Sequence, residues 1–117
     1  MPQPDDWPRP PHALPCHRLD EPPEGARVTV AGLVLVRQRP GTAKGVIFVT
    51  LEDETGICNV VVWQKMYQKY RRAVVAGRLL RVTGRIQRDG QVVHLVADLV
   101  EDMSFLLDKL VEVQEPA

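Results

Sequence analysis

Three consecutive carboxylates, Glu52, Asp53 and Glu54, are the first residues of this sequence that could do chemistry. Carboxylate oxygens are ligands for divalent cations. Consecutive residues of a strand point to opposite faces, however, and this run leads into a Thr-Gly pair that is typical of a turn. We therefore favour the solvated end of a hairpin over a metal site.

Cys16 and His17, with His12 nearby, are a second group of potential ligands, but they lie in a proline-rich stretch without zinc-type spacing. We interpret Cys16 and Cys58 as reduced thiols, with a disulfide as the minor alternative. No Ser, His and Asp combination has interpretable spacing, and no glycine-rich phosphate loop precedes a helix. We expect no metal, no cofactor and no catalytic residue, which argues against an enzyme.

Basic residues are the third kind of candidate, and they are concentrated in the middle of the chain. The 117 residues contain 15 Lys and Arg and 15 Asp and Glu, so the net charge is zero. Divided by segment, residues 1–24 carry −3, residues 25–90 carry +8 and residues 91–117 carry −5. A basic segment of this kind is expected for a protein that binds a phosphate backbone. The acidic flanks could instead fold over the basic face and compete with nucleic acid.

The elements that would position these residues follow from periodicity. Residues 1–24 hold eight of the ten prolines, a density that blocks helices and sheet ladders. Alternating and β-branched residues then predict five strands, and a spacing of three and four predicts a helix over 64–75 that ends at Gly77. The strands are expected at residues 27–39, 46–53, 57–63, 78–88 and 91–97. A last segment, 104–113, also has helical period.

Five short strands with a helix between the third and fourth is the order of the OB-fold, a Greek-key barrel. An SH3-like barrel would not require a helix there. We predict a mainly β chain with three parts: a Pro-rich arm or linker at 1–24, an OB-fold domain at 25–100 and an acidic C-terminal helix or tail at 101–117. No run approaches the roughly 18 apolar residues of a membrane helix, and no export signal is present. We expect a soluble, cytoplasmic monomer.

Two stretches of the sequence are distinctive, VTVAGLVLVRQRPGTAKGVIFVTLEDETGICNVVVWQKMYQKYRR and VTGRIQRDGQVVHLVA. From Arg27 to Ala97 the chain resembles the C-terminal OB-fold module of the bacterial error-prone DNA polymerase, the second C-family DNA polymerase III alpha subunit. GVIFVTLEDETG is more loosely similar to replicative alpha subunits and to the anticodon-binding domains of class II aminoacyl-tRNA synthetases. The RQRPGTAKG loop and GRIQRDGQVVHLVA carry most of the resemblance.

The resemblance implies a nucleic-acid-binding module used in DNA replication, DNA repair and damage-induced translesion synthesis. Nothing in the sequence resembles the polymerase palm, the histidinol-phosphatase-like domain or the tandem helix-hairpin-helix of that family, so polymerase activity is not carried over. The implied partners are single-stranded DNA, with RNA as the alternative, and other proteins of the mutagenesis complex. Those proteins would be an inactive Y-family-like polymerase and a RecA-like protein.

OB-folds bind oligonucleotides over strands two and three, between the first-to-second and fourth-to-fifth strand loops. By alternation we expect Arg37 and Arg39 to point outward at the end of strand one. Phe48 would stack on a base, and Asn59 would contact a base edge; the synthetase likeness implies anticodon contacts for these two positions. The candidate nucleic-acid-binding residues are Arg37, Arg39, Lys44, Phe48, Thr50, Asn59, Val61, Trp63, Arg85 and Arg88.

Two of these candidates, and several other side chains of the barrel and helix, have a structural alternative to nucleic-acid binding. Phe48 could pack beneath the arm or the C-terminal helix, and Trp63 could brace the helix on the barrel. Arg81 could pair with acids of the tail, and His94 could be a packing residue. Lys65, Lys69, Arg71 and Arg72 could form a solvated helix face. The apolar SFLLDKLVEV segment either caps the barrel or docks a partner, so a protein-interaction module is the alternative function.

Overall fold

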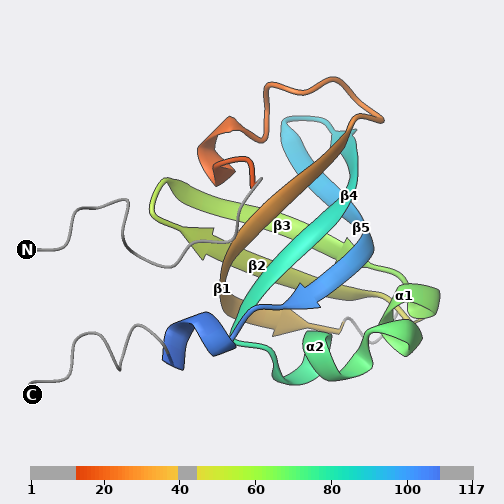
Figure 1. Cartoon of the computed structure of the whole chain (residues 1–117). Helices are drawn as coiled ribbons and strands as arrows, with labels where there is room; N and C mark the ends of the chain where they lie inside the picture. The colour runs from red at the N-terminus through yellow and green to blue at the C-terminus, as the bar shows by residue number, and fades with distance from the viewer. Residues whose placement is uncertain (1–12, 40–44, 109–117) are drawn as a thin grey trace, which may run out of the picture.

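A computed structural model of the chain describes residues 13–39 and 45–108 (Figure 1). Its five strands form a closed barrel in the order β1-β2-β3-β5-β4. The strands are β1 (Arg27–Gln38), β2 (Ile47–Asp53), β3 (Gly56–Val62), β4 (Leu79–Asp89) and β5 (Val92–Asp102). Strands β3 and β5 pair in parallel, and the other neighbours are antiparallel. The prediction of a mainly β, five-stranded barrel is confirmed.

Two short helices connect β3 to β4, where the periodicity predicted one. Helix α1 (Gln64–Lys69) and helix α2 (Arg71–Ala76) meet at Tyr70, whose φ of −116° and ψ of 30° interrupt the helix. Gly77 follows α2 as expected, but with a φ of −65° it does not adopt the left-handed conformation. A Cβ atom on Gly77 would lie 2.6 Å from the carbonyl oxygen of Ala73, so glycine is required there for close packing.

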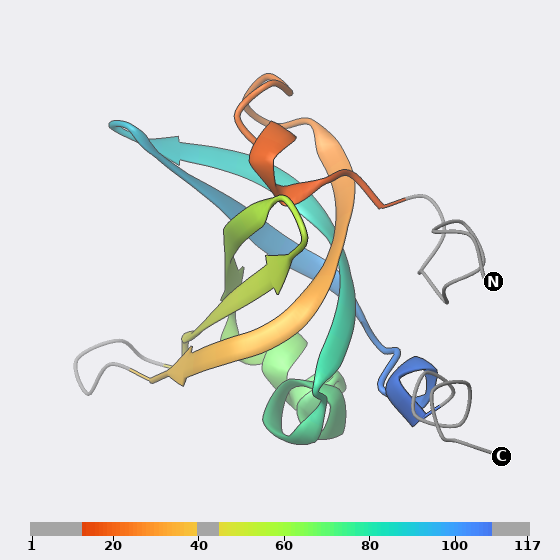
Figure 2. The same cartoon turned by 90° about the vertical axis from the view of Figure 1, so that its left-hand side faces the viewer.

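The core fills the barrel and is closed at both ends. Its largest fully buried side chains come from all five strands and from α2. They are Leu51, Leu80, Ile86, Leu95, Val30, Val49, Val60, Val62, Val74 and Val82. Figures 1 and 2 show α1 and α2 at one end of the barrel and the 3-10 turn η2 (Cys16–Arg18) at the other. Cys16 and Leu19, which are 3% and 5% exposed, extend the core at that second end.

The described part of the Pro-rich segment, residues 13–24, packs on the barrel. The Leu14 N–H donates to the carbonyl of Thr29 at 2.7 Å, and the Cys16 N–H donates to Asp53 Oδ2 at 2.8 Å. Residues 13–24 form no strand, as the prolines predict, but Cys16 and Leu19 of this segment are buried against the barrel. The predicted domain boundaries stay predictions. Residues before the boundary at 24/25 contact the barrel, and β5 continues across the boundary at 100/101.

A bulge in β1 changes which side chains face inward. Val34 lies opposite Leu51, and Val36 lies opposite Thr50, so Leu35 is an extra residue on β1. Val36, expected inside, is 44% exposed as a result. The sequence predicts that Val28, Val30, Val34 and Val36 share the inward face of this strand, with a bend or bulge at Gly32. The bulge lies instead between Val34 and Val36, so the predicted alternation is wrong after Val34.

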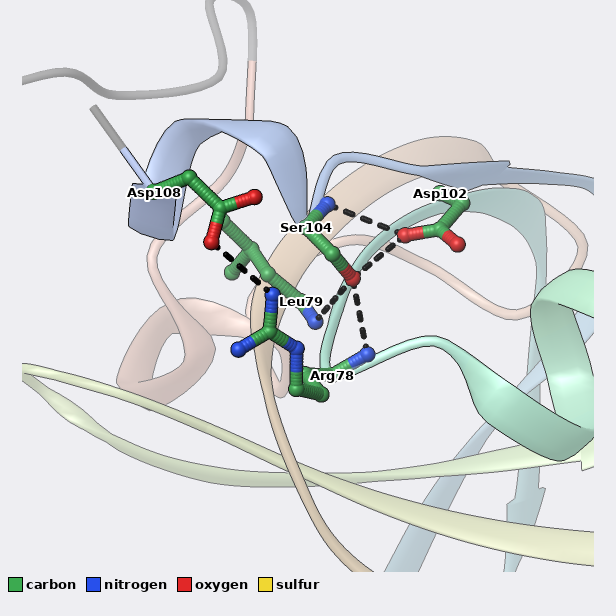
Figure 3. Close-up of polar contacts among 5 residues, drawn as sticks. All are labelled: Arg78, Leu79, Asp102, Ser104 and Asp108. Atoms are coloured by element: carbon green, nitrogen blue, oxygen red, sulfur yellow. Dashed lines mark hydrogen bonds and ion pairs between the residues drawn. The ribbon is translucent and has the colours of Figure 1, made fainter.

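The chain after β5 forms a short helical turn at residues 105–108, tied to the start of β4 (Figure 3). Ser104 Oγ accepts from the Arg78 N–H at 2.8 Å and donates to Asp102 Oδ1 at 2.5 Å. Arg78 also pairs with Asp108 at 3.3 Å. The rest of the predicted 104–113 helix lies outside the described residues. No helix in the described part of the chain is long and apolar enough to cross a bilayer.

Candidate nucleic-acid interface

Strands β2, β3 and β5 carry a group of side chains on the outside of the barrel. Phe48 lies opposite Val61, and Thr50 lies opposite Asn59. Across the parallel pairing, Asn59 is in register with His94 and Val61 with Val96. Directly opposed residues project to the same face of a sheet, and the intervening residues Val49, Val60 and Leu95 are buried inside. We call Phe48, Thr50, Asn59, Val61, His94 and Val96 the outward face.

The outward face brings together four of the residues that alternation placed outside. Phe48, Thr50 and Asn59 are half-buried, and Val61 is only 5% exposed. Val61 thus supports its neighbours and offers little surface of its own. Trp63 is 52% exposed just after β3, and its carbonyl accepts from the Tyr67 N–H at 2.9 Å at the start of α1. This backbone contact begins the helix and does not involve the indole ring, so the bracing role of the Trp63 side chain stays a prediction.

His94 belongs to the outward face, although the sequence favoured a packing role for it. Its ring centroid lies 6.5 Å from that of Phe48, with 57° between the ring planes. This separation is within the range of favourable aromatic pairs. The alternation of QVVHLVA, in which Val93 and Leu95 are the inward residues, was the signal that could have placed His94 outside.

Arg37 is exposed, but it does not share the outward face of the sheet. Because of the bulge, it lies opposite Val49, an inward residue that is 1% exposed. Its Nε donates to the carbonyl of Val74 at 2.6 Å, and its Nη2 donates to the carbonyl of Gly77. A guanidinium in this place satisfies free carbonyl groups at the C-terminal end of α2.

Arg39 is also engaged within the molecule. Its guanidinium carbon lies 4.8 Å from the centroid of the Tyr67 ring of α1, a cation–π distance. The expected parity is therefore wrong for Arg37, because the bulge shifts the alternation of the last residues of β1. Arg39 lies beyond the end of β1 and is exposed, so its nucleic-acid-binding role stays a prediction. Lys44, the neighbouring candidate, lies outside the described residues.

Arg85 and Arg88 lie toward the β4–β5 turn; Arg88 contacts the N-terminal segment 13–24, and Arg85 contacts Gly25 directly after it. Arg85 is in register with Val96 of the outward face, and its Nη1 donates to the carbonyl of Gly25 at 3.0 Å. Arg88 Nη2 donates to the carbonyls of Asp20 and Pro22, both at 2.7 Å. Of the candidate arginines, Arg85 is the one that the sheet register aligns with the outward face.

Acidic residues of β5 pair with arginines on the β1–β4 side of the barrel. Arg27 and Asp98 form an ion pair at 3.0 Å, and Arg81 and Glu101 form one at 2.8 Å. The predicted pairing of Arg81 with an acid of the tail is confirmed. The hydrogen bond from Arg81 lowers the pKa of Glu101. Because β5 carries three acids, the net charge of residues 25–102 is +5, compared with +8 for residues 25–90.

The remaining basic residues that we considered lie on the helices. Lys65, Arg71 and Arg72 are exposed on α1 and α2, at the end of the barrel. The Lys69 ammonium lies 5.4 Å from the centroid of the Tyr70 ring. These cations surround the barrel end and do not belong to the outward face as defined by the strand register.

The carboxylate run at the β2–β3 turn is a structural feature. Asp53 Oδ1 accepts from the Thr55 N–H at 2.8 Å and from the Gly56 N–H at 3.1 Å. Within residues 13–39 and 45–108, no group of His, Cys, Asp and Glu could hold a metal ion.

A shallow depression of about 520 Å³ next to Arg27, Thr29 and Thr83 lies on the β1–β4 side, away from the outward face. The feature of this geometry that suits a ligand is therefore the outward face, which is a binding surface and not a metal site.

Curated relatives match the barrel with high identity. The chain is 68% identical over 78 residues to the error-prone DNA polymerase of Ruegeria pomeroyi, a match covering 67% of this chain and 7% of that protein. It is 60% identical over 86 residues to error-prone DNA polymerase 1 of Rhizobium meliloti, covering 74% of this chain and 8% of the relative. The chain thus spans less than a tenth of the length of these relatives.

Solved structures share the fold at low identity. Asparaginyl-tRNA synthetase from Pyrococcus horikoshii, complexed with asparaginyl-adenylate, superposes with a TM-score of 0.67 at 23% identity, over 78% of this chain and 22% of that chain. The Stn1-Ten1 complex of S. pombe superposes with a TM-score of 0.59 at 21% identity, over 75% of this chain and 65% of that chain. Residues 28–103 also match a protein family described as the OB-fold nucleic acid binding domain. The five-stranded barrel and this match together show that the chain belongs to the family of OB-fold nucleic acid binding domains.

Proposed function

We propose that the chain binds single-stranded nucleic acid across its outward face, as a non-catalytic module of an error-prone DNA polymerase. Single-stranded DNA is the preferred ligand in this proposal, because relatives that match the barrel with 68% and 60% identity are error-prone DNA polymerases. The observation that carries the proposal is that Asn59 and His94 are in register on one face of the sheet, and that the Phe48 ring, in the neighbouring row of the same face, lies 6.5 Å from the His94 ring. Stacking on such rings tolerates any base, because every base has a flat face.

In this proposal the candidate residues divide into those that contact bases, those that contact phosphates and those that only add positive charge. Phe48 and His94 would contact bases, and the amide of Asn59 would donate to or accept from a base edge. Arg85 would contact phosphate next to Val96, and Lys44 is kept in that role from the sequence alone. Arg37, Arg39 and Arg88 would contribute to the positive potential while they hold the barrel, the helices and the N-terminal segment together.

A direct test compares two phenylalanines at different positions, the half-buried Phe48 of the outward face and the exposed Phe105 of the C-terminal turn. Binding of a fluorescent oligo-dT strand is measured by anisotropy at low salt for the native chain, Phe48→Ala and Phe105→Ala. Loss of one stacking contact of about 1–3 kcal/mol should weaken binding by roughly 5- to 150-fold in Phe48→Ala. Phe105 is 51% exposed on the C-terminal turn, and its replacement should leave affinity unchanged.

The same titration decides between DNA and RNA when the oligonucleotide is replaced by oligo-U. Equal loss in both phenylalanine variants, or no binding by the native chain at low salt, would contradict the proposal. The second result would favour the alternative of a protein-interaction module. The observation that supports a protein-interaction module is the apolar surface of the C-terminal turn, where the exposed Phe105 lies beside the half-buried Leu106 and Leu107.

A further inference from the structure

Two cysteines that are 42 residues apart in the sequence meet where the N-terminal segment joins the barrel. Cys16 lies in the 3-10 turn η2, and Cys58 lies in β3. Their sulfur atoms are 3.2 Å apart, each residue is 3% exposed, and both thiols are free. The fold has therefore placed two thiols in direct contact in the core.

The surrounding hydrogen bonds hold this turn in register with the β2–β3 hairpin. The Cys16 N–H donates to Asp53 Oδ2 at 2.8 Å, and the His17 N–H donates to Thr55 Oγ1 at 3.1 Å. Leu19, on the same segment, is 5% exposed in the core. The contact between the sulfur atoms is thus one part of a defined docking site for residues 13–24.

We propose that Cys16 and Cys58 are a redox-reversible pair, and that their disulfide locks residues 13–24 onto β3. A disulfide requires the sulfur atoms to approach to about 2.05 Å, so they must move by little more than ~1 Å from their present separation. Rotation of the two side chains and a small shift of the short turn can supply this movement. The bond would close a loop between two cysteines that lie 42 positions apart in the sequence.

The reaction balances with a small disulfide such as oxidised glutathione as the oxidant. One cysteine thiolate attacks a glutathione sulfur, forms a mixed disulfide and releases one glutathione thiolate. The second cysteine then attacks the protein sulfur of that mixed disulfide, and the second glutathione leaves as a thiolate. The two protein thiols lose two electrons and two protons in total, and the S–S bond of the oxidant accepts the electrons.

Access controls the rate of this reaction. The hydrogen bond to Cys58 and burial both raise the pKa of Cys16, which keeps the native sulfur protonated and unreactive. Oxidant therefore reaches the pair when residues 13–24 open. The same segment supplies the carbonyls of Asp20 and Pro22 that accept from Arg88, so the redox state also sets how firmly this arginine is held.

The test avoids slow access by refolding the chain from urea in a buffer of oxidised and reduced glutathione. Mass spectrometry should show the loss of two hydrogen atoms without bound glutathione, and neither cysteine should react with iodoacetamide after denaturation. Dithiothreitol should restore both thiols. The oxidised form should have a Tm on the order of 10 °C above the reduced form, and amide hydrogens of residues 13–24 should exchange more slowly.

Matched controls are Cys16→Ala and Cys58→Ala, with Cys16→Val and Cys58→Val as second variants if a smaller side chain prevents folding. None of these should gain stability in the oxidising buffer. Two alkylatable thiols, or stable glutathione adducts, in the refolded native chain would overturn the proposal. A disulfide form that is no more stable than the reduced chain would also overturn it, because the bond would then strain the docking site.

Discussion

Arg37 connects the end of β1 to the last turn of α2 through two carbonyl groups, those of Val74 and Gly77. Hydrogen bonds from a charged donor contribute about 1.5–3 kcal/mol each. Arg37→Met keeps most of the apolar stem and removes both donors. Because Arg37 is exposed, water replaces part of what these two bonds contribute, and we expect the free energy of unfolding in urea to fall by roughly 2–3 kcal/mol.

The matched control for this prediction is Arg72→Met, at an exposed position of α2. A surface change of this kind should stay within about 0.5 kcal/mol of the native chain. Equal stability of the two variants, together with a selective loss of oligonucleotide binding in Arg37→Met, would instead return this residue to the phosphate-binding role.

Asp53 fastens the N-terminal segment to the β2–β3 turn through its carboxylate. Burial by itself raises the pKa of Asp53, but the hydrogen bonds from Thr55 and Cys16 outweigh it and lower the pKa below its ordinary value. A carboxyl with a lowered pKa contributes stability above its unfolded pKa of about 4. That stability is lost as the pH falls through the folded pKa.

Asp53→Asn should therefore be less stable than the native chain at pH 7, and the difference should shrink between about pH 5 and pH 2. Urea unfolding at several pH values measures it. Glu52→Gln, at an exposed position one residue earlier, should keep the pH dependence of the native chain. An unchanged pH profile in Asp53→Asn would show that the hydrogen bonds are equally strong with a neutral group.

At the scale of the elements, irregularities in the strands decide where side chains point. The β4–β5 pairing changes register between Thr83 and Gly84, which leaves Asp98 as the extra residue on β5. Asp98 uses this position to pair with Arg27. Bulges commonly redirect a side chain in this way.

Gly84 makes this register possible, because a Cβ atom there would overlap the carbonyl of Val96. Gly84→Ala must displace backbone in the centre of the sheet, and we expect it to cost at least ~3 kcal/mol of folding stability. Gly90 is the control, with a φ of 64° and open space around its Cα. Gly90→Ala should cost only about 1–2 kcal/mol for the left-handed backbone; equal costs would contradict the close-packing account.

At the scale of the whole molecule, the distribution of charge matters more than its sum. The neutral chain contains a barrel of net charge +5 over residues 25–102. Ion pairs on the β1–β4 side use Arg27 and Arg81, while Arg85 is aligned with the outward face. Phosphate contacts release counterions, so the affinity for single strands should fall on the order of 10-fold between 50 and 200 mM salt.

Arg85→Ala should reduce the slope of log affinity against log salt by about 0.7, the value expected for one phosphate contact on a single strand. Arg72→Ala, which removes a charge from α2, should leave the slope unchanged and so separates local contact from net charge. The measurement is a salt series of the same anisotropy titration. Parallel slopes for the native chain and Arg85→Ala would remove Arg85 from the interface.

Local patterns predicted much of this molecule. Alternation located β2 and β3 within a residue of their observed ends and placed Phe48, Thr50 and Asn59 on the outside. The end of β5 was missed because the bulge at Asp98 interrupts the alternation there. The break between α1 and α2 was missed because both halves continue the same helical spacing across Tyr70.

The sequence by itself determined the order of the strands and the parity of the regular ones, since period-two alternation is a property of neighbouring residues. The tertiary structure alone decided the roles of Arg37, Arg39 and the two cysteines. One inserted residue in β1 turned Arg37 toward α2, and Arg39, beyond the end of β1, lies beside Tyr67 of α1. The contact between Cys16 and Cys58 depends on how the N-terminal segment docks on the barrel, which no local pattern encodes.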